Sequence, residues 1–159
     1  MIIRHATIQD IPGLERLLSQ VLDVHHAGRP DLFKPHARKY TTAQLQQLLA
    51  DPSRPIFVAV AEAAAPGEIM GYAFCEHQQH LDDNILTDIK TLYIDDLCVD
   101  ELQRGKHVGS ALYQHVLHYA RQQGFYNVTL NVWALNEGAY RFYERMGLAP
   151  QKYGLEVIL

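Results

Sequence analysis

The segment Asp100–Ser110, DELQRGKHVGS, joins three features that decide the fold. An apolar, β-branched run ends just before it, a short loop with one glycine and two basic residues follows, and an amphipathic pattern begins at Val108. A helix that starts directly after a strand presents unpaired N–H groups and the positive end of its dipole. Arg104 and Lys106 add positive charge, so the junction predicts an anion site that suits a pyrophosphate. The segment has neither the GxxxxGK[ST] pattern nor the GxGxxG fingerprint, which excludes those two nucleotide-binding classes.

The elements around this junction follow from hydrophobic periodicity and turn residues. The C-terminal half is expected to begin with a long central strand over Ile89–Val99, followed by a helix over Val108–Gln122 that ends at Gly124. A buried strand over Val128–Ala134 and a helix over Asn136–Met146 that ends at Gly147 are expected next. The tail to Leu159 is expected to carry at least one more strand. The N-terminal half is expected to contain a strand over Ile2–His5, a helix capped by Thr7 or Asp10, a loop over Asp23–Lys39, a helix from Thr41 or Thr42 to about Ala50, and a hairpin of strands over Ile56–Glu62 and Ile69–His77. Residues 78–88 are polar and leave the local structure open.

Length and composition limit the possible classes of protein. The 159 residues are 48% hydrophobic and 20% charged, which fits a single globular domain over residues 1–159. A net charge of −4 without a basic stripe argues against a nucleic-acid partner. No secretory signal or membrane-length apolar run is present, so we expect a cytoplasmic protein without a membrane partner. The two cysteines, Cys75 and Cys98, lie in expected strands and predict buried, reduced thiols.

Two motifs give the sequence a resemblance to the GNAT superfamily of N-acetyltransferases. Gln103–Ser110 is similar to the family's pyrophosphate loop, Q/R-x-x-G-x-G/A, read from Arg104 to Gly109, although His107 stands where the first glycine is usual. Asn136–Gly147, NEGAYRFYERMG, resembles the family's N-x-x-A-x-x-F-Y-E-x-x-G helix. The two motifs occur in the family's order, with a helix and a buried strand between them.

The resemblance implies a fold and a cosubstrate, acetyl-CoA. The fold would be α/β (α+β), with a mixed, mostly antiparallel central sheet flanked by helices and splayed between the strands over Ile89–Val99 and Val128–Ala134. The residues implied in cofactor binding are Leu97, Cys98 and Val99 through their backbone toward the pantetheine arm, Arg104, Gly105, Lys106, His107, Val108, Gly109 and Ser110 toward the pyrophosphate, and Asn136 toward the arm or a strand end. Asn136 is placed almost as well for a plain helix cap.

The resemblance also implies direct attack of an amine on the thioester. Tyr143 matches the tyrosine that protonates the departing thiolate, with a packed core aromatic as its alternative. Asp95 is the first candidate for the base, on the expectation that Asp95 and Asp96 point to opposite faces of their strand. A hydrogen-bonded structural aspartate is nearly as good an interpretation, and Glu76 and His77 are weaker candidates.

Several questions stay open at this point. The acceptor is expected to be a small-molecule amine or a peptide or protein amine, and residues 25–34 are either part of its pocket or a surface loop. The nine histidines show no metal-ligand spacing, so no metal is expected. The tail over Ala149–Leu159 could pair with a second subunit in a homodimer. Acylation of a hydroxyl, use of a longer acyl chain, and a non-catalytic acyl-CoA-binding or regulatory module are the alternatives.

Overall fold

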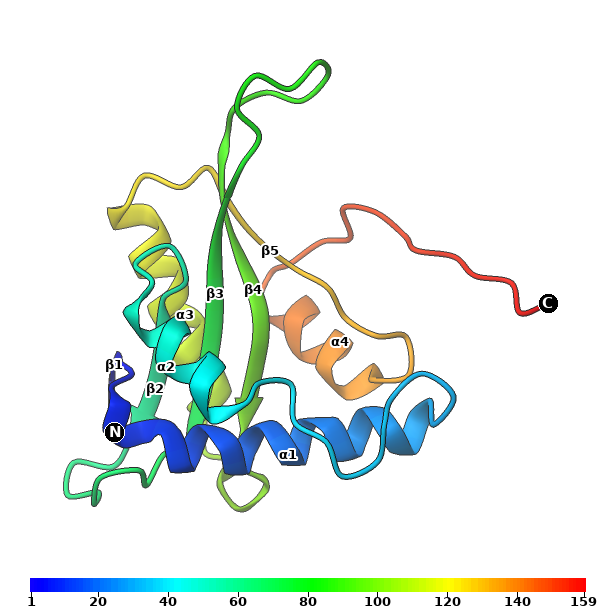
Figure 1. Cartoon of the computed structure of the whole chain (residues 1–159). Helices are drawn as coiled ribbons and strands as arrows, with labels where there is room; N and C mark the ends of the chain where they lie inside the picture. Colours follow the sequence, from blue (N-terminus) through cyan, green and yellow to red (C-terminus); the bar gives the residue numbers. More distant parts are fainter.

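The structure, a computed structural model, describes residues 1–159 and is built around one five-stranded sheet (Figure 1). Its strands are β1 (Ile2–His5), β2 (Ile56–Val60), β3 (Gly71–Gln79), β4 (Lys90–Val99) and β5 (Asn127–Leu130), in the order β1-β2-β3-β4-β5. The pairs from β1 to β4 are antiparallel, and β4 pairs with β5 in parallel. The predicted mixed, mostly antiparallel sheet is confirmed.

Four α-helices flank the sheet: α1 (Ile11–Gly28), α2 (Thr42–Ala50), α3 (Val108–Gln122) and α4 (Glu137–Arg145). Two short 3-10 turns, η1 (Ile8–Asp10) and η2 (Glu101–Gln103), precede α1 and α3. Figure 1 shows α1 and α2 on one face of the sheet, α3 on the other, and α4 beside β4 and β5. The helices therefore enclose both faces while α4 stands near the parallel pair.

Strand β2 explains why the core divides into two apolar clusters. All five of its residues are buried, and alternate side chains of a strand point to opposite faces. Val58 joins a cluster with Leu14, Leu17 and other residues on the α1–α2 side, whereas Phe57 joins a cluster with Leu112 and other residues under α3. The continuous apolar run IFVAV is thus the signature of a strand covered on both faces.

Helix caps agree with the residues expected to supply them. Thr7 and Asp10 form a capping box before α1, and the buried Asp10 carboxylate accepts hydrogen bonds from Arg4 at 2.7 and 3.0 Å. Thr41 accepts from the backbone N–H of Gln44 at the start of α2. Asn136 caps α4 by accepting from the N–H of Ala139 at 3.1 Å.

Three boundaries differ from the expected ones. Helix α1 continues through Asp23 to Gly28, because the first proline after it is Pro30 and Gly28 lies against the side chain of Leu135. Strand β5 ends at Leu130 rather than at residue 134. The predicted strand in the tail was wrong: residues 149–159 form no helix or strand and are exposed, since no strand of the sheet pairs with them. No helix in the structure has the length and apolar character needed to cross a membrane.

Candidate active site

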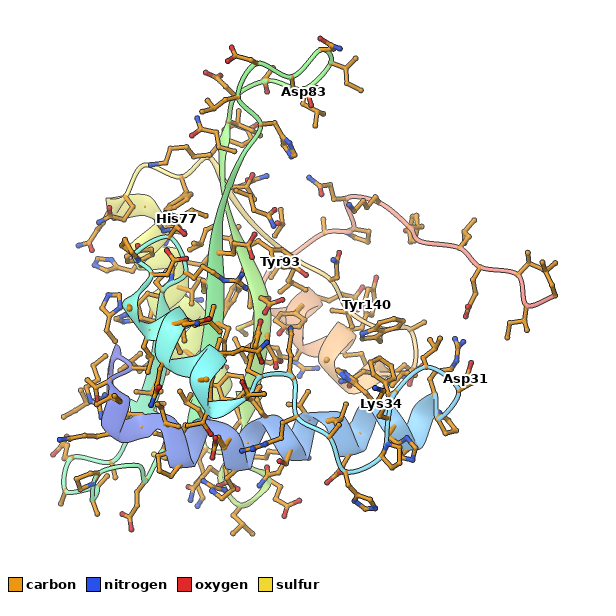
Figure 2. All side chains as sticks on the ribbon, viewed as in Figure 1. Asp31, Lys34, His77, Asp83, Tyr93 and Tyr140 are labelled. Carbon is orange, nitrogen blue, oxygen red and sulfur yellow. The ribbon has the colours of Figure 1, made fainter.

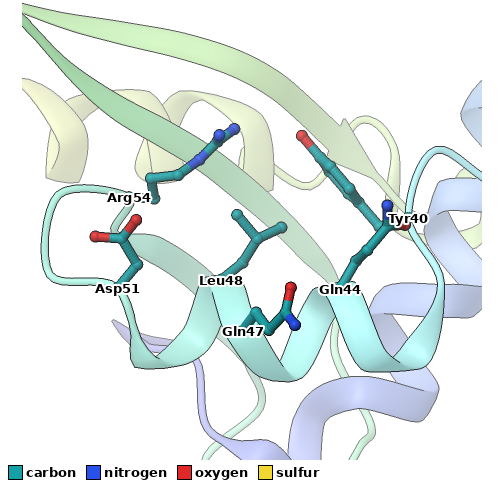
Figure 3. A pocket seen from close by; sticks show the side chains of 6 residues that line it. All are labelled: Tyr40, Gln44, Gln47, Leu48, Asp51 and Arg54. Carbon is teal, nitrogen blue, oxygen red and sulfur yellow. The ribbon is translucent and has the colours of Figure 1, made fainter.

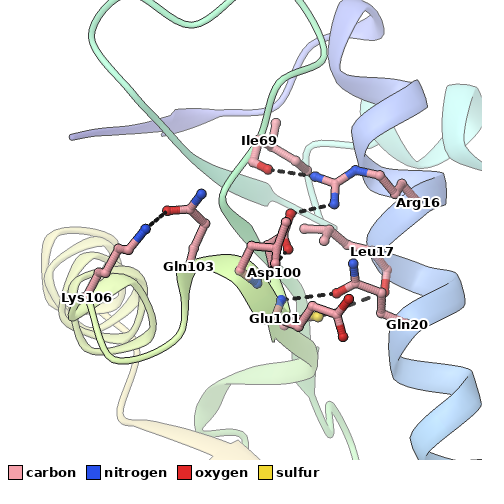
Figure 4. A network of polar contacts seen from close by, with 10 residues as sticks. Arg16, Leu17, Gln20, Ile69, Asp100, Glu101, Gln103 and Lys106 are labelled. Carbon is pink, nitrogen blue, oxygen red and sulfur yellow. Dashed lines mark hydrogen bonds and ion pairs between the residues drawn. The ribbon is translucent and has the colours of Figure 1, made fainter.

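The segment over residues 100–110, called the phosphate loop below after the role predicted for it, is fixed at its start to α1 by polar contacts (Figure 4). The buried Asp100 carboxylate accepts hydrogen bonds from Arg16 at 2.5 Å and from the N–H of Leu102 at 3.0 Å. The N–H of Glu101 donates to the amide oxygen of Gln20 at 3.3 Å. Burial and these donors act in opposite directions on the Asp100 carboxyl, and the donors, led by Arg16, leave its pKa lowered. An ionised aspartate therefore anchors the chain where β4 ends.

The loop itself has two residues in the left-handed region. Gly105 has φ 78°, and His107, the N-cap of α3, has φ 62°. A non-glycine with this conformation is uncommon, and it follows from His107 standing at the expected glycine position. Such left-handed turns point successive N–H groups to one side, which makes an anion-binding concavity.

The N-terminus of α3 leaves its first-turn donors available. No side chain caps the helix at His107, so the amides of Val108, Gly109 and Ser110 keep the orphan N–H groups of a helix start. The dipole and Lys106, whose Nζ donates to Gln103 at 3.0 Å, add positive potential. The residues present fit a diphosphate at this place.

Gly109 lets three elements meet beside the loop. A Cβ built on Gly109 would lie 3.3 Å from Val99 of β4 and 3.4 Å from Phe142 of α4. The last glycine of the loop motif is therefore explained by the close packing of α3 against both neighbours.

Strands β4 and β5 separate where the resemblance implied. Their pairing runs from Thr91 with Asn127 to Ile94 with Leu130 and then stops. Beyond that point the backbone of Leu97, Cys98 and Val99 has no strand on the β5 side, although β3 still pairs with all three. The predicted splay is confirmed, and unpaired strand groups of this kind can hydrogen-bond an extended amide-bearing ligand.

A β-bulge at Asp95 changes the expected directions of the two aspartates. Phe74 of β3 opposes Asp96 and the next residue, Cys75, opposes Ile94, so Asp95 is the extra residue. Regular alternation would place Asp95 and Asp96 on opposite faces, but a bulge breaks it. The expectation of opposite faces was wrong.

Both carboxylates instead engage tyrosines of the α1–α2 side. The hydroxyl of Tyr40 donates to Asp95 Oδ2 at 2.6 Å, and Lys39 Nζ lies 2.9 Å from Asp95 Oδ1. The hydroxyl of Tyr72 donates to Asp96 Oδ2 at 2.9 Å. The rings of Tyr40 and Tyr72 both pack on Phe74, with centroids 5.5 and 4.9 Å away.

The environments of the two aspartates differ. Asp95 has a cation in direct contact, whereas Asp96 has none. Burial, with the charge of Asp95 as a smaller contribution, raises the pKa of Asp96 to about 6, against the opposing effects of Lys39 and Tyr72. A carboxyl with this pKa can accept a proton near neutral pH. Sequence reasoning favoured Asp95, since the bulge that brings Asp96 to the same side has no signature in the residue pattern.

The surroundings of Tyr143, on α4, keep its phenol protonated. Burial and then the charge of Asp96 raise the pKa of the Tyr143 phenol well above its usual value. Its ring packs at 6.4 Å from Tyr113 and at 5.1 Å from Phe142. A phenol that stays protonated at neutral pH can hydrogen-bond a departing thiolate and supply its proton as the carbon–sulfur bond breaks.

Cys98 fits a structural role. The side chain is 5% exposed, its thiol donates to the carbonyl of Leu17 at 3.9 Å, and burial raises its pKa to about 12. A protonated, buried thiol is a poor nucleophile. Both Cys75 and Cys98 are free, as the sequence predicted.

The weaker candidates lie elsewhere. Glu76 pairs with Arg54 at 3.2 Å, and His77 contacts the hydroxyl of Tyr119 under α3 (Figure 2). His25 packs on Phe33 and Trp133, with centroids 5.0 and 6.5 Å away, and so belongs to a contact between the segment after α1 and the β5–α4 loop. No group of three potential metal ligands is brought together in the structure.

Two shallow pockets adjoin the site without covering the splay. One, of about 310 Å³, lies over α2 and is lined by Tyr40, Gln44, Gln47, Leu48, Asp51 and Arg54 (Figure 3). The other, of about 390 Å³, lies between α1 and the phosphate loop and is lined by Gln20, Asp23, Val24, Ala27, Glu101 and Arg104. Tyr40 connects the first pocket with Asp95, and Arg104 borders the second.

Comparisons with known proteins define the class as the acetyltransferase fold. The sequence profile described as "Acetyltransferase (GNAT) family" matches residues 21–148, so the chain belongs to that family. A mutant of the BH1408 protein from Bacillus halodurans is 31% identical and has a TM-score of 0.93, with 100% of both chains covered. A comparison with curated protein sequences gives no significant match.

More distant structures share the fold. A putative acetyltransferase from Agrobacterium tumefaciens is 21% identical with a TM-score of 0.72, covering 100% of both chains. An aminoglycoside acetyltransferase from an uncultured soil metagenomic sample, in complex with sisomicin, is 20% identical with a TM-score of 0.74, covering 99% of this chain and 95% of that one. A ribosomal-protein-alanine N-acetyltransferase from Brucella melitensis is 16% identical with a TM-score of 0.72, covering 100% of both chains.

Proposed function

We propose that this protein is an N-acetyltransferase that moves the acetyl group of acetyl-CoA to a primary amine by direct attack. The observation that carries the proposal is the place where β4 leaves β5. Asp96 lies at this place on β4, its charge acts on the Tyr143 phenol of α4, and residues 100–110 follow at the end of the same strand. Acetyl-CoA, when bound, supplies the acetyl group as an activated thioester.

The cosubstrate would be held mostly by the backbone. The amides of residues 104–110 would bind the pyrophosphate, and the unpaired groups of Leu97, Cys98 and Val99 would bind the pantetheine arm. Val99 is four steps along the strand from Asp95, about 13 Å at the usual rise of a strand, which a pantetheine-sized arm can span. Asn136, already bonded to the N–H of Ala139, has spare capacity to bind the arm.

Two side chains would carry the protons. A carboxylate of the bulge would take a proton from the acceptor's ammonium group, and its contacts favour Asp96 over Asp95 because Lys39 already neutralises Asp95. Tyr143 would donate a proton to the departing thiolate. An N–H of β4 at the bulge would stabilise the negative charge on the carbonyl oxygen.

An amine acceptor is supported by the activities for which two proteins of the same fold are named. One acetylates aminoglycosides and another the alanine of a ribosomal protein, and amino groups are the sites that these names imply. The identity of this chain with both is too low to choose between a small-molecule amine and a protein amine.

The test combines calorimetry with a thiol-release assay. Purified protein should bind CoA and acetyl-CoA, and should release thiol with at least one member of a panel of amines. Tyr143→Phe should lower kcat roughly a hundredfold with unchanged CoA affinity, because only the proton donor is removed. Tyr140→Phe is the matched control on the same helix, since Tyr140 is exposed (Figure 2).

The outcomes separate the proposal from its alternatives. CoA binding without thiol release for any amine would favour a non-catalytic acyl-CoA-binding module. Thiol release with alcohols or with longer acyl thioesters alone would point to the other enzyme classes. Absence of CoA binding would overturn the assignment.

The proposal extends to a homodimer and a cytoplasmic location, which stay predictions. The tail is available for a partner, since Tyr153, Leu155 and Val157 are all at least 80% exposed and β5 is the edge strand of the sheet. Light scattering after size-exclusion chromatography of the full chain and of a chain ending at residue 149 would test the dimer.

A further inference from the structure

The side chain of Lys39, from the segment between α1 and α2, contacts strand β4. Lys39 Nζ is 2.9 Å from the carboxylate of Asp95 and donates to the backbone carbonyl of Asp95 at 3.3 Å. Both contacts fall on the bulge where β4 leaves β5. The side chain is 41% exposed, so solvent still reaches it. A primary amine belonging to the protein therefore occupies the neighbourhood in which an acceptor amine has to react.

The groups around Lys39 are those that acyl transfer to an amine requires. The positive charge of Lys39 lowers the pKa of Asp96, and the negative charge of Asp96 raises the pKa of Tyr143. Asp96 follows Asp95 on the bulge, so the carboxylate of Asp96 is one residue along the strand from the groups that Lys39 contacts. The bulge thus combines a candidate nucleophile with a candidate base, and the candidate acid, Tyr143, lies on α4.

The other four lysines have different surroundings. Lys106 Nζ contacts Gln103, and Lys90 Nζ donates to the carbonyl of Gln123 at 3.2 Å. Lys34 is exposed on the segment between α1 and α2 (Figure 2). Lys152 is exposed in the tail. None of these four side chains forms a hydrogen bond or ion pair with the bulge, so proximity singles out Lys39.

We propose that Lys39 is a self-acetylation site, modified within the same molecule by its own bound acetyl-CoA. This inference rests on the proposed function. Lys39 Nζ loses a proton to Asp96 and forms a bond with the acetyl carbonyl carbon, the carbon–sulfur bond of the thioester breaks, and Tyr143 gives its proton to the thiolate. The second proton of the nitrogen leaves as the amide forms and returns to the Tyr143 phenolate, and Asp96 releases its proton to solvent. The products are an amide on Lys39 and free CoA.

Acetylation would change the contacts of the bulge. The amide of acetyl-lysine is neutral, so the ion pair with Asp95 would be lost. The segment over residues 29–41 would then be held to β4 by the hydrogen bond from Tyr40 to Asp95. The modification would therefore loosen the segment that borders the reaction centre.

The first experiment follows acetylation by mass spectrometry. The full chain is incubated with acetyl-CoA and no acceptor, and peptides are mapped over time. We expect one acetyl group on Lys39, added with a first-order rate constant that does not change with protein concentration. In Tyr143→Phe this rate constant should be roughly a hundredfold lower. Lys39→Arg, which keeps the charge, should remain unmodified, whereas Lys34→Arg, the control on the same segment, should be modified as the unaltered protein is.

Other results would overturn the inference. These are an unmodified Lys39 in protein that binds acetyl-CoA, equal acetylation of Lys34 and Lys39, or an observed rate constant that rises in proportion to protein concentration. Failure of the proposed function is recognised separately, because protein that does not bind CoA in the calorimeter fails before this step.

The second experiment needs no acetyl-CoA. Lys39→Gln imitates the neutral acetylated side chain, while Lys39→Arg keeps the ion pair. Limited trypsin digestion should cleave after Arg38 faster in Lys39→Gln than in Lys39→Arg, because only the glutamine variant has lost the ion pair with Asp95. Equal cleavage rates would contradict the proposed consequence of the modification.

Discussion

Along β4, the edge toward β3 is paired from Lys90 to Val99, interrupted only by the bulge, whereas the edge toward β5 is paired only from Thr91 to Ile94. The paired edge stabilises the sheet, since almost every backbone group there has a partner. The open edge leaves donors and acceptors unsatisfied by the fold, and such groups are available to a ligand. One strand thus supplies stability on one side and a binding surface on the other.

The bulge stands at the boundary between these two uses. It brings Asp95 and Asp96 to the α1–α2 side, and their contacts then assign them different tasks. Asp95 joins the segment before α2 to the sheet through Lys39 and Tyr40, whereas Asp96 has only the Tyr72 hydroxyl. If this is correct, substitutions on the open edge should affect catalysis and those on the paired edge should affect stability.

The largest effect is expected from Asp96→Asn. An amide cannot accept the ammonium proton, so kcat/KM should fall about a thousandfold in the thiol-release assay. Asp95→Asn is the matched control one residue away and should cost roughly tenfold or less, because it removes an ion pair and leaves the base. A larger loss of kcat/KM in Asp95→Asn than in Asp96→Asn would show that Asp95, and not Asp96, is the base.

Much of this arrangement can be predicted from the sequence. The run IKTLYIDDLCV, the amphipathic helix after it and the glycines that end the helices were sufficient for β4, α3 and α4, because these are encoded in periodicity and in glycines at fixed positions. The splay followed from the resemblance that the two motifs carry. The left-handed conformation of His107 was also foreseeable, since the loop needs it at that position.

What the sequence could not supply is long-range. The bulge depends on how β3 and β4 register, so the direction of Asp96 has no local signature. Lys39 and Tyr40 reach Asp95 across 56 and 55 residues, and no pattern of spacing reports such contacts. The tail alternates like a strand, but a strand needs a partner, and the chain provides none.

A change on the paired edge tests the other half of the comparison. A Cβ on Gly71 would lie 2.7 Å from the carbonyl oxygen of Cys98 and 3.0 Å from Leu112, so Gly71→Ala forces β3 away from β4. The free energy of unfolding should fall by about 3 kcal/mol in urea denaturation, as overpacking of this kind does. Gly154→Ala, with nothing within 4 Å of its added Cβ, is the control and should leave the stability unchanged.

The pH dependence of stability probes Asp96 without an assay of activity. Its pKa is raised from 3.8 to about 6 in the folded state, so its stability contribution is present below pH 3.8 and is lost as pH rises through about 6. At about pH 8 the free energy of unfolding of Asp96→Asn should therefore exceed that of the unaltered protein by on the order of 2 kcal/mol. The difference should vanish at about pH 4. A constant difference at both pH values would mean that the carboxyl does not titrate in this range.

The smallest effect concerns the loop at the end of the open edge. His107 has φ 62°, a conformation that costs a non-glycine roughly 1 kcal/mol, so His107→Gly should raise the free energy of unfolding by up to about 1 kcal/mol. His107→Val should lower it, because a β-branched residue tolerates positive φ least. The Kd for CoA of the glycine variant should stay within roughly twofold, since glycine keeps the backbone N–H groups to which we assign the pyrophosphate. A much weaker affinity would show instead that the imidazole itself contacts the phosphates, and the loop would then bind through a side chain as well as through its amides.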